Sequence, residues 1–235
     1  MRKQIFVVSD IHGHFNELIA SLTNCGFENN NPRHCLIVCG DLFDRGIQNK
    51  EVYNYLRCLN NVKILLGNHD LFFKDLDDND SYRVHFNYRY NGFDKSVSAF
   101  SNINIKELYD KSNSELKQAI EKATPGFLDW LANLPFYYET ENYIFTHAGF
   151  DFQNGLQNTC WKEFVWLESE RIENLDLKQF NIHKKLVMGH RPTIILGEKD
   201  YDIHYSKDGQ KIYIDGGVAY GGKINVLIIE DEEIF

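Results

Sequence analysis

The sequence predicts an α/β protein in which two sheets form a sandwich, flanked by helices and carrying a helical cap insertion. Two observations predict this class. Apolar runs alternate with segments of helical spacing in the first third of the chain, and strand-like runs return after a long helical stretch. With 235 residues, 43% of them hydrophobic, the chain has the size of one core. We therefore expect a single domain over residues 1–235, with the insertion at about 71–142.

Three short apolar runs in the first half predict strands at Ile5–Val8, Leu36–Val38 and Val62–Leu66. None of them alternates with polar residues, which is typical of strands buried on both faces. Apolar residues at helical spacing predict helices between them, at Phe15–Leu22 and Val52–Leu59. Right-handed crossovers then give a parallel sheet, whose strands all end at the same edge.

The insertion contains helical patterns at Glu115–Lys122 and Phe127–Leu134, whereas Tyr82–Phe93 is rich in aromatic residues and has no clear period. After the insertion, we expect one helix over Thr159–Arg171 and a second sheet. Its strands are expected at Tyr143–Thr146, Leu186–Met188, Lys211–Ile214 and Asn225–Glu230.

Composition excludes several classes of protein. A net charge of −9 and a pI near 5.5 argue against a general electrostatic grip on nucleic acid. The five cysteines lack the paired spacing of a zinc site or a disulfide framework, so we expect reduced thiols. The apolar run at Ile5–Val8 is too short for a signal peptide, and no run could span a membrane. A cytoplasmic protein with no membrane partner is expected, and its oligomeric state stays open.

Polar clusters follow the expected strands, and they supply carboxylate, imidazole and amide oxygen groups. In order, they are Asp10-x-His12, Gly40-Asp41-x-x-Asp44-Arg45-Gly46, Gly67-Asn68-His69-Asp70, His147 and Gly189-His190. This mixture suits manganese, iron or zinc better than a thiolate site or an all-oxygen calcium site would. Two ions held about 3.5–4 Å apart need a bridging carboxylate, and Asp41 is the candidate.

In this order the clusters resemble the calcineurin-like metallophosphoesterase superfamily, whose D-x-H, GD, GNH[DE], H and GH elements match over essentially the whole length. The added Asp44-Arg45-Gly46 resembles the phosphoprotein phosphatase branch, in particular its small bacterial and phage Ser/Thr-type members. The resemblance implies a two-sheet metallophosphoesterase sandwich. It also implies two divalent metal ions, with manganese expected and iron or zinc as alternatives.

The resemblance assigns a role to each matching residue. It implies a first metal held by Asp10, His12 and Asp41, and a second held by Asp41, Asn68, His147 and His190. A metal-bridging hydroxide would attack phosphorus directly, without a covalent intermediate. Arg45 and Asn68 would contact the substrate phosphate, His69 would protonate the leaving oxygen, and Asp44 would orient His69.

Each cluster alone also has a structural explanation. Asp44-Arg45-Gly46 can be a salt-bridged turn, Asn68-His69-Asp70 a helix N-cap, and His147 or His190 a packed core histidine. Their joint occurrence at consecutive strand ends favours a metal site. Surface or packing roles are expected for His14, His34, His85, His183 and His204, and Asp215-Gly216-Gly217 can be a plain β-turn.

Departures from the phosphoprotein phosphatase pattern concern the substrate. Related enzymes tend to place a second phosphate-binding arginine shortly after the tryptophan that corresponds to Trp166, and here Glu168 follows instead. A carboxylate cannot hold phosphate, so the missing charge would come from Arg171, Lys162 or Arg191.

The expected activity is hydrolysis of phosphate monoesters on phosphoserine or phosphothreonine, with a phosphorylated protein or a small phosphoester as partner. The first alternative is a bis(nucleosyl)tetraphosphatase resembling the diadenosine tetraphosphatases, in which Tyr82–Phe93 could stack a purine. The second is a noncatalytic binding scaffold. The complete set of expected metal ligands and the presence of His69 argue against the scaffold.

Overall fold

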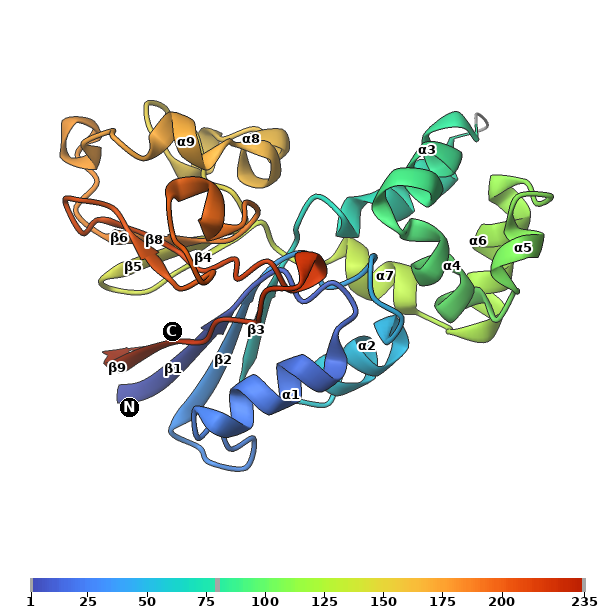
Figure 1. Cartoon of the computed structure of the whole chain (residues 1–235), viewed down its shortest axis with the longest axis horizontal. Helices are drawn as coiled ribbons and strands as arrows, with labels where there is room; N and C mark the ends of the chain where they lie inside the picture. Colours follow the sequence, from blue (N-terminus) through green and yellow to red (C-terminus); the bar gives the residue numbers. More distant parts are fainter. Residues whose placement is uncertain (1, 79–80, 234–235) are drawn as a thin grey trace.

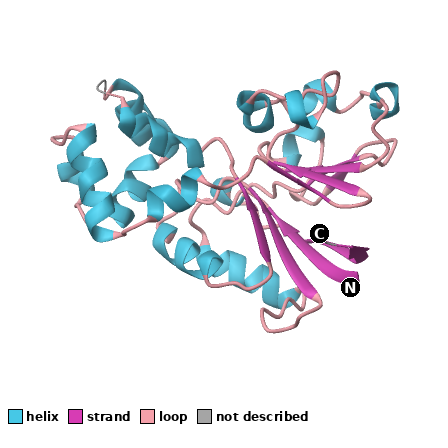
Figure 2. Ribbon diagram, turned by 180° about the vertical axis from the view of Figure 1, so that it is seen from behind, coloured by secondary structure: helices cyan, strands magenta, loops and turns pink. Residues whose placement is uncertain are grey.

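A computed structural model describes residues 2–78 and 81–233 of the chain. It contains a four-stranded sheet and a five-stranded sheet, with helices outside them and a lobe of helices to one side (Figures 1 and 2). The α/β class with two flanked sheets is therefore confirmed. In both views the parallel strands of the four-stranded sheet run toward the helical lobe, so their carboxyl ends and that lobe meet near the centre.

The first sheet has the order β3-β2-β1-β9. Strands β1 (Arg2–Val8), β2 (His34–Cys39) and β3 (Val62–Leu65) are parallel, as the sequence predicts. Strand β9 (Leu227–Glu233) pairs antiparallel with β1. The prediction that this strand belongs to the second sheet is wrong. Strand β9 instead pairs with the free edge of β1, a partner that a local pattern does not reveal.

Both faces of β1 and β2 are buried, which explains their unbroken apolar runs. Phe6 and Val38 face the helices α1 (Phe15–Asn24) and α2 (Asn49–Arg57). The alternate residues Ile5, Val7, Ile37 and Cys39 pack in a second cluster with residues of the other sheet, including Phe145, Val187 and Ile212. The two sheets therefore form a sandwich around a shared apolar layer.

The second sheet has the order β4-β5-β6-β8-β7. Its strands are β4 (Tyr137–Glu139), β5 (Tyr143–Thr146), β6 (Lys185–Met188), β7 (His204–Tyr205) and β8 (Lys211–Tyr213). Short 3-10 helices connect the elements of this half: η2 (Leu156–Asn158), η3 (Leu177–Phe180), η4 (Thr193–Leu196) and η5 (Val218–Tyr220).

One expected helix over Thr159–Arg171 is two short helices in the structure, α8 (Trp161–Trp166) and α9 (Ser169–Ile172). Leu167 and Glu168 between them are extended. The break lets Leu167 pack against Gly149, where an added Cβ would lie 2.6 Å from its side chain. Tertiary packing therefore ends α8, although no proline or glycine marks the position.

The helical lobe consists of η1 (Asp70–Asp77), α3 (Tyr82–Asn91), α4 (Phe93–Ser101), α5 (Ile105–Leu108), α6 (Asn113–Ala123) and α7 (Phe127–Ala132). The expected boundary at about residue 142 includes β4, which pairs with β5, so the helical part ends earlier. Stacked rings of Phe100 and Phe127 lie with centroids 3.7 Å apart, and both contact Phe43, which follows β2. The lobe thereby shares its aromatic core with the first sheet.

The aromatic segment without a clear period forms α3. Val84 and Tyr88 are buried, while Tyr82, Phe86 and Tyr90 are exposed on the same helix. Apolar residues on both faces blur the helical period in the sequence. Among the described residues, the longest apolar helical stretches are too short to pass through a lipid bilayer.

Candidate active site

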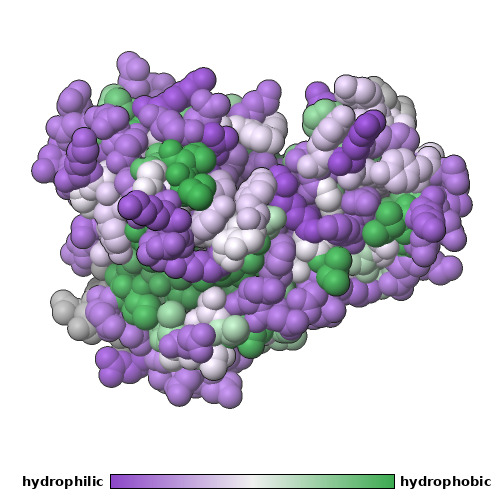
Figure 3. All heavy atoms as spheres, in the orientation of Figure 1, coloured by the Kyte–Doolittle hydropathy of each residue, from purple (hydrophilic) through white to green (hydrophobic). Residues whose placement is uncertain are grey.

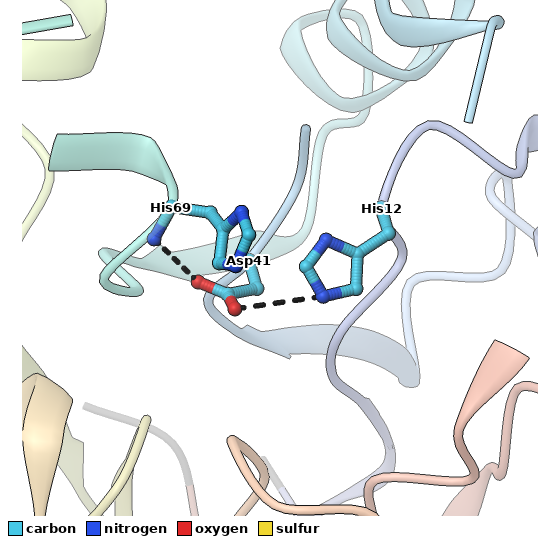
Figure 4. A group of neighbouring side chains, drawn as sticks. All are labelled: His12, Asp41 and His69. Carbon is cyan, nitrogen blue, oxygen red and sulfur yellow. Dashed lines mark hydrogen bonds and ion pairs between the residues drawn. The ribbon is translucent and has the colours of Figure 1, made fainter. Parts of the chain in front are cut away.

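Loops at the carboxyl ends of both sheets bring the expected site residues together. Asp10 and His12 follow β1, Asp41 follows β2, Asn68 and His69 follow β3, His147 follows β5, and His190 follows β6. In the described part of the chain, two groups have potential ligand atoms that all lie within 4.8 Å of one another: His12, Asp41 and His69, and Asp10, Asp41 and His147. Asp41 belongs to both groups. In Figure 4 its carboxylate lies between the His69 backbone and the His12 ring.

The loops that hold these side chains have an unusual backbone. Residues other than glycine rarely adopt positive φ, yet six site residues do so: Asp10, His12, Asp41, Asp44, Arg45 and His190. Such conformations cost about 1–3 kcal/mol each and persist only where the surrounding structure enforces them. Their concentration in these loops indicates a site that is held in shape at the expense of stability.

Two glycines allow the carboxylates to approach neighbouring loops. A Cβ added to Gly67 would lie 2.1 Å from Oδ1 of Asp41, and one added to Gly189 would lie 2.1 Å from Oδ2 of Asp10. Both carboxylates belong to buried loops, so a shift that made room for a Cβ would cost stability. This contact gives a physical reason for glycine directly before Asn68 and directly before His190.

The ring orientation of two buried histidines suits metal ligands. His12 Nδ1 lies 2.9 Å from the carbonyl oxygen of Phe43, and His147 Nδ1 lies 2.8 Å from that of Cys39. Each Nδ1–H can donate to its carbonyl, which leaves Nε2 as an unprotonated ligand atom directed at Asp41. Burial lowers the pKa of both imidazoles well below the usual value, so they stay neutral.

The donor set fits two divalent cations. Asp10 and Asp41 are buried and form no salt bridge to lysine or arginine within the described residues. Burial and then a neighbouring carboxylate, Asp215 for Asp10 and Asp10 for Asp41, raise the pKa of both well above the usual value. The Asn68 amide oxygen adds a further ligand, 2.9 Å from His147 Nε2 and 3.0 Å from His190 Nδ1. Buried acidic groups among neutral oxygen and nitrogen donors are what a cation would stabilise.

His69 and Asp44 form a buried hydrogen-bonded pair next to this cluster. His69 Nδ1 lies 2.8 Å from Asp44 Oδ2, and the Asp44 side chain has no exposed surface. Burial and then the charge of Arg45 lower the pKa of His69 to about 3, whereas burial raises that of Asp44. The hydrogen bond to Asp44 is a contact that would stabilise an imidazolium at His69. The geometry leaves Nε2 of His69 available to a substrate.

A pocket of about 350 Å³ lies over the cluster. Arg45 and Arg191 both line it, and the Nε atom of each is buried without a hydrogen-bond partner. The Arg45 guanidinium lies 5.1 Å from the centroid of the Tyr220 ring. Two guanidinium groups thus line the space above the expected metal ligands, where anionic oxygens would satisfy them.

Arg191, Arg171 and Lys162 are the three candidates for a second phosphate-binding residue beside Arg45, and the structure distinguishes them. Arg191 lines the pocket and bonds Glu170 at 2.6 Å. Arg171 is exposed and paired with Glu168 at 2.8 Å, while Lys162 lies over the Trp161 ring, and neither lines the pocket.

The chain is similar to known proteins. The family profile described as calcineurin-like phosphoesterase matches residues 3–220. The chain belongs to the calcineurin-like phosphoesterase family. This phosphoesterase is 42% identical over 67 residues to a symmetrical bis(5'-nucleosyl)-tetraphosphatase of Vibrio vulnificus. The match covers 28% of the chain and 24% of that relative, so the chain aligns with about a quarter of the relative's length.

Solved structures show the same fold at low identity. A candidate diadenosine tetraphosphatase superposes with a TM-score of 0.63 at 18% identity, covering 100% of this phosphoesterase and 95% of that chain. A protein serine/threonine phosphatase from Saccharomyces cerevisiae superposes with a TM-score of 0.56 at 13% identity, covering 100% of this chain and 82% of the other.

A second hollow of about 410 Å³ continues along α3 from the pocket over the cluster. The two share Asn68, Phe72, Phe86, Asn91 and Trp166 as lining residues. The outer hollow is further lined by exposed aromatic side chains of Tyr82 and Trp161. It lies between the helical lobe and α8, and the space-filling view shows the molecule notched between these two lobes (Figure 3).

Three further residues of this phosphoesterase support the site. The Asp70 carboxylate accepts N–H groups of Asp41, Leu42 and Gly67 at 2.8–3.0 Å, which joins the loops after β2 and β3. Asp215 lines the pocket while accepting the N–H of Gly217, so it is both a turn residue and part of the wall. Ser96 contacts Asp44 from the helical lobe, and no sequence signal pointed to it.

Proposed function

We propose that this phosphoesterase hydrolyses nucleotide polyphosphates, in the manner named for its curated relatives, the symmetrical bis(5'-nucleosyl)-tetraphosphatases. One observation carries the proposal. Two arginines line the phosphate pocket, and that pocket continues into a hollow lined by aromatic rings. A substrate with several phosphates and a nucleobase at each end would use both features.

We propose Asp10, His12 and Asp41 as ligands of the first metal, and Asp41, Asn68, His147 and His190 as those of the second. The groups of neighbouring donor atoms divide differently, since one combines Asp41 with His12 and His69 and the other combines Asp41 with Asp10 and His147. Manganese is the expected ion. When bound, two such ions lower the pKa of a water molecule toward neutrality and offset the charge of the phosphoryl oxygens. Asp41 supports a bridging position because it lies in both groups of neighbouring donor atoms.

The remaining steps belong to side chains of the chain itself. The Arg45 guanidinium presents a planar fork of donors that matches two phosphoryl oxygens, and the Asn68 amide lies in the same pocket. His69 Nε2 would deliver a proton to the departing oxygen. Asp44 would hold the ring at the required angle through Nδ1.

The second arginine favours a polyphosphate over a single phosphate group. A phosphoserine peptide offers one phosphoryl group, which Arg45 alone can bind. Arg191 would bind a phosphoryl group farther along a polyphosphate chain, after exchanging its bond with Glu170. Phe86 and Trp166 are both about half exposed at the junction of the two hollows, and stacking on an aromatic ring contributes about 1–3 kcal/mol per base.

A phosphoserine or phosphothreonine phosphatase is the second candidate, and the His69–Asp44 pair favours it. A serine alkoxide is a strong base and needs a proton to leave, whereas a nucleoside diphosphate leaves readily without one. A noncatalytic scaffold is the third possibility, and the convergence of all the expected ligands argues against it.

One comparison tests these functions. We would measure kcat/KM of the manganese-loaded protein on diadenosine tetraphosphate, a phosphoserine peptide and p-nitrophenyl phosphate. The tetraphosphate should be the best substrate and should yield two molecules of nucleoside diphosphate. A preference for the phosphopeptide would replace this function by the second candidate. Absence of turnover on all three would support the scaffold.

The two arginines should have separable effects. Arg191→Ala should raise the KM for the tetraphosphate about 10-fold and leave p-nitrophenyl phosphate nearly unchanged, because only the longer substrate reaches it. Arg45→Ala should reduce kcat/KM about 10- to 100-fold on both, with both metals retained. Arg171→Ala, which removes an exposed arginine outside the pocket, is the matched control. Loss of metal and of the fold in Arg45→Ala would instead indicate a salt-bridged turn.

A further inference from the structure

The helical insertion contacts the loop that carries Asp44 and Arg45. Gly92 joins α3 to α4 with φ of 74°, and a Cβ added to it would lie 2.7 Å from the backbone nitrogen of Arg45. Lys95 Nζ donates a hydrogen bond to the carbonyl oxygen of Arg45. Ser96, on the same turn of α4, bonds Asp44. The first turn of α4 therefore packs directly on the catalytic loop.

Ser96 makes two hydrogen bonds to Asp44 and is fully buried. Its Oγ donates to Asp44 Oδ1 at 2.5 Å and accepts the N–H of Asp44 at 2.8 Å. The other carboxylate oxygen, Oδ2, bonds His69 Nδ1 at 2.8 Å. The carboxylate is thus fixed at both oxygens, by the insertion on one side and by the imidazole on the other.

We propose that Ser96 is a positioning residue for the His69–Asp44 pair, and that the insertion thereby takes part in protonating the leaving group. The proposal rests on the general-acid role proposed above for His69. Without the hydroxyl, Oδ1 of Asp44 would be buried with no donor, which is costly for a carboxylate. The carboxylate would rotate to find another donor, and its rotation would move Oδ2 away from His69.

The backbone of the loop has a separate anchor, which makes Ser96 a selective probe. Asn49 Oδ1 also accepts the N–H of Asp44, at 3.0 Å, and Asn49 Nδ2 donates to the carbonyl oxygen of Gly46 at 3.1 Å. Removing the Ser96 hydroxyl should therefore free the carboxylate without releasing the loop that also carries Arg45.

The test compares Ser96→Ala with a matched control, Ser98→Ala. Ser98 lies on the same helix and donates one hydrogen bond to the carbonyl oxygen of Ile103, away from Asp44. The substrates are phenyl phosphate and p-nitrophenyl phosphate, which share a ring and differ in leaving-group basicity. Ser96→Ala should lower kcat about 10-fold on phenyl phosphate and less than about 2-fold on p-nitrophenyl phosphate, with both metals bound. Ser98→Ala should leave the ratio of the two rates unchanged.

Two further variants decide how Ser96 acts. Ser96→Thr keeps the hydroxyl and should restore most of the rate on phenyl phosphate. In a His69→Asn background, Ser96→Ala should have no further effect, because both changes remove the same proton donor. Equal loss on both substrates, or an additive loss in the His69→Asn background, would overturn the proposal. A wrong general-acid role would be visible separately, since His69→Asn alone would then lack leaving-group dependence.

Discussion

Asp41→Asn is expected to remove both metal ions and to lower kcat by more than about 100-fold. This loss is larger than is typical when a residue that only hydrogen-bonds to a metal ligand is replaced. Asp41 is the residue common to both ligand groups, and its two oxygens lie 3.4 Å from His147 Nε2 and 3.6 Å from His12 Nε2. Asparagine keeps the shape but offers only one neutral oxygen. It therefore cannot bridge two cations or offset their repulsion.

The comparison variant is Asp10→Asn, because Asp10 belongs to one group only. We expect it to lose part of the metal, whereas Asp41→Asn loses both ions, as measured by elemental analysis of the purified proteins. Asp77→Asn, at an exposed aspartate paired with Lys117, controls for the loss of one negative charge. Loss of a single ion from both site variants would contradict the bridging role of Asp41.

A chelator supplies the companion measurement on the unmodified protein. We expect complete loss of phosphoesterase activity and recovery when manganese is added, because the proposed nucleophile is a water acidified by the ions. Full activity after verified metal removal would refute metal-dependent hydrolysis. The same titration with iron and zinc would rank the possible native ions.

The meeting of the site residues at one edge of the sheet can be predicted from the sequence, because apolar runs and the polar residues after them are visible there. The runs at β1 and β2 lack alternation because both faces are buried, and the parallel strands β1, β2 and β3 bring their carboxyl ends to one edge. Polar clusters after those runs therefore had to meet. The two glycines before Asn68 and His190 were visible too, although their reason, contact with Asp41 and Asp10, became clear only from the structure.

Other features depend on partners far away in the chain. The edge at which β9 pairs is decided by the open side of β1, which no local pattern of apolar residues records. The break between α8 and α9 follows from packing of Leu167 on Gly149. Arg191 could be named only as one of three candidates, since its reach into the pocket depends on the turn after β6. Ser96 lies 52 residues from Asp44, in a helix with no catalytic motif.

His69→Asn is expected to reduce kcat on phenyl phosphate about 10²–10⁴-fold, the usual contribution of a general acid, and to affect p-nitrophenyl phosphate much less. Phenolate is the stronger base, so its departure depends more on receiving a proton. Nitrophenolate can leave unassisted. The expectation rests on the position of His69, whose Nδ1 lies 2.8 Å from Asp44 while the residue lines the pocket over the cluster.

Asp44→Asn should show the same asymmetry in weaker form, because it keeps the imidazole and only misorients it. The measurement is kcat for both aryl phosphates in the wild type and the two variants, with metal content determined for each. Asn at position 69 also removes a possible nitrogen ligand near His12 and Asp41, so retention of both ions is the necessary control. If His69→Asn lowers both rates by one factor while both ions stay bound, His69 is not the proton donor. Its role would then be to position the phosphoryl group or the attacking water.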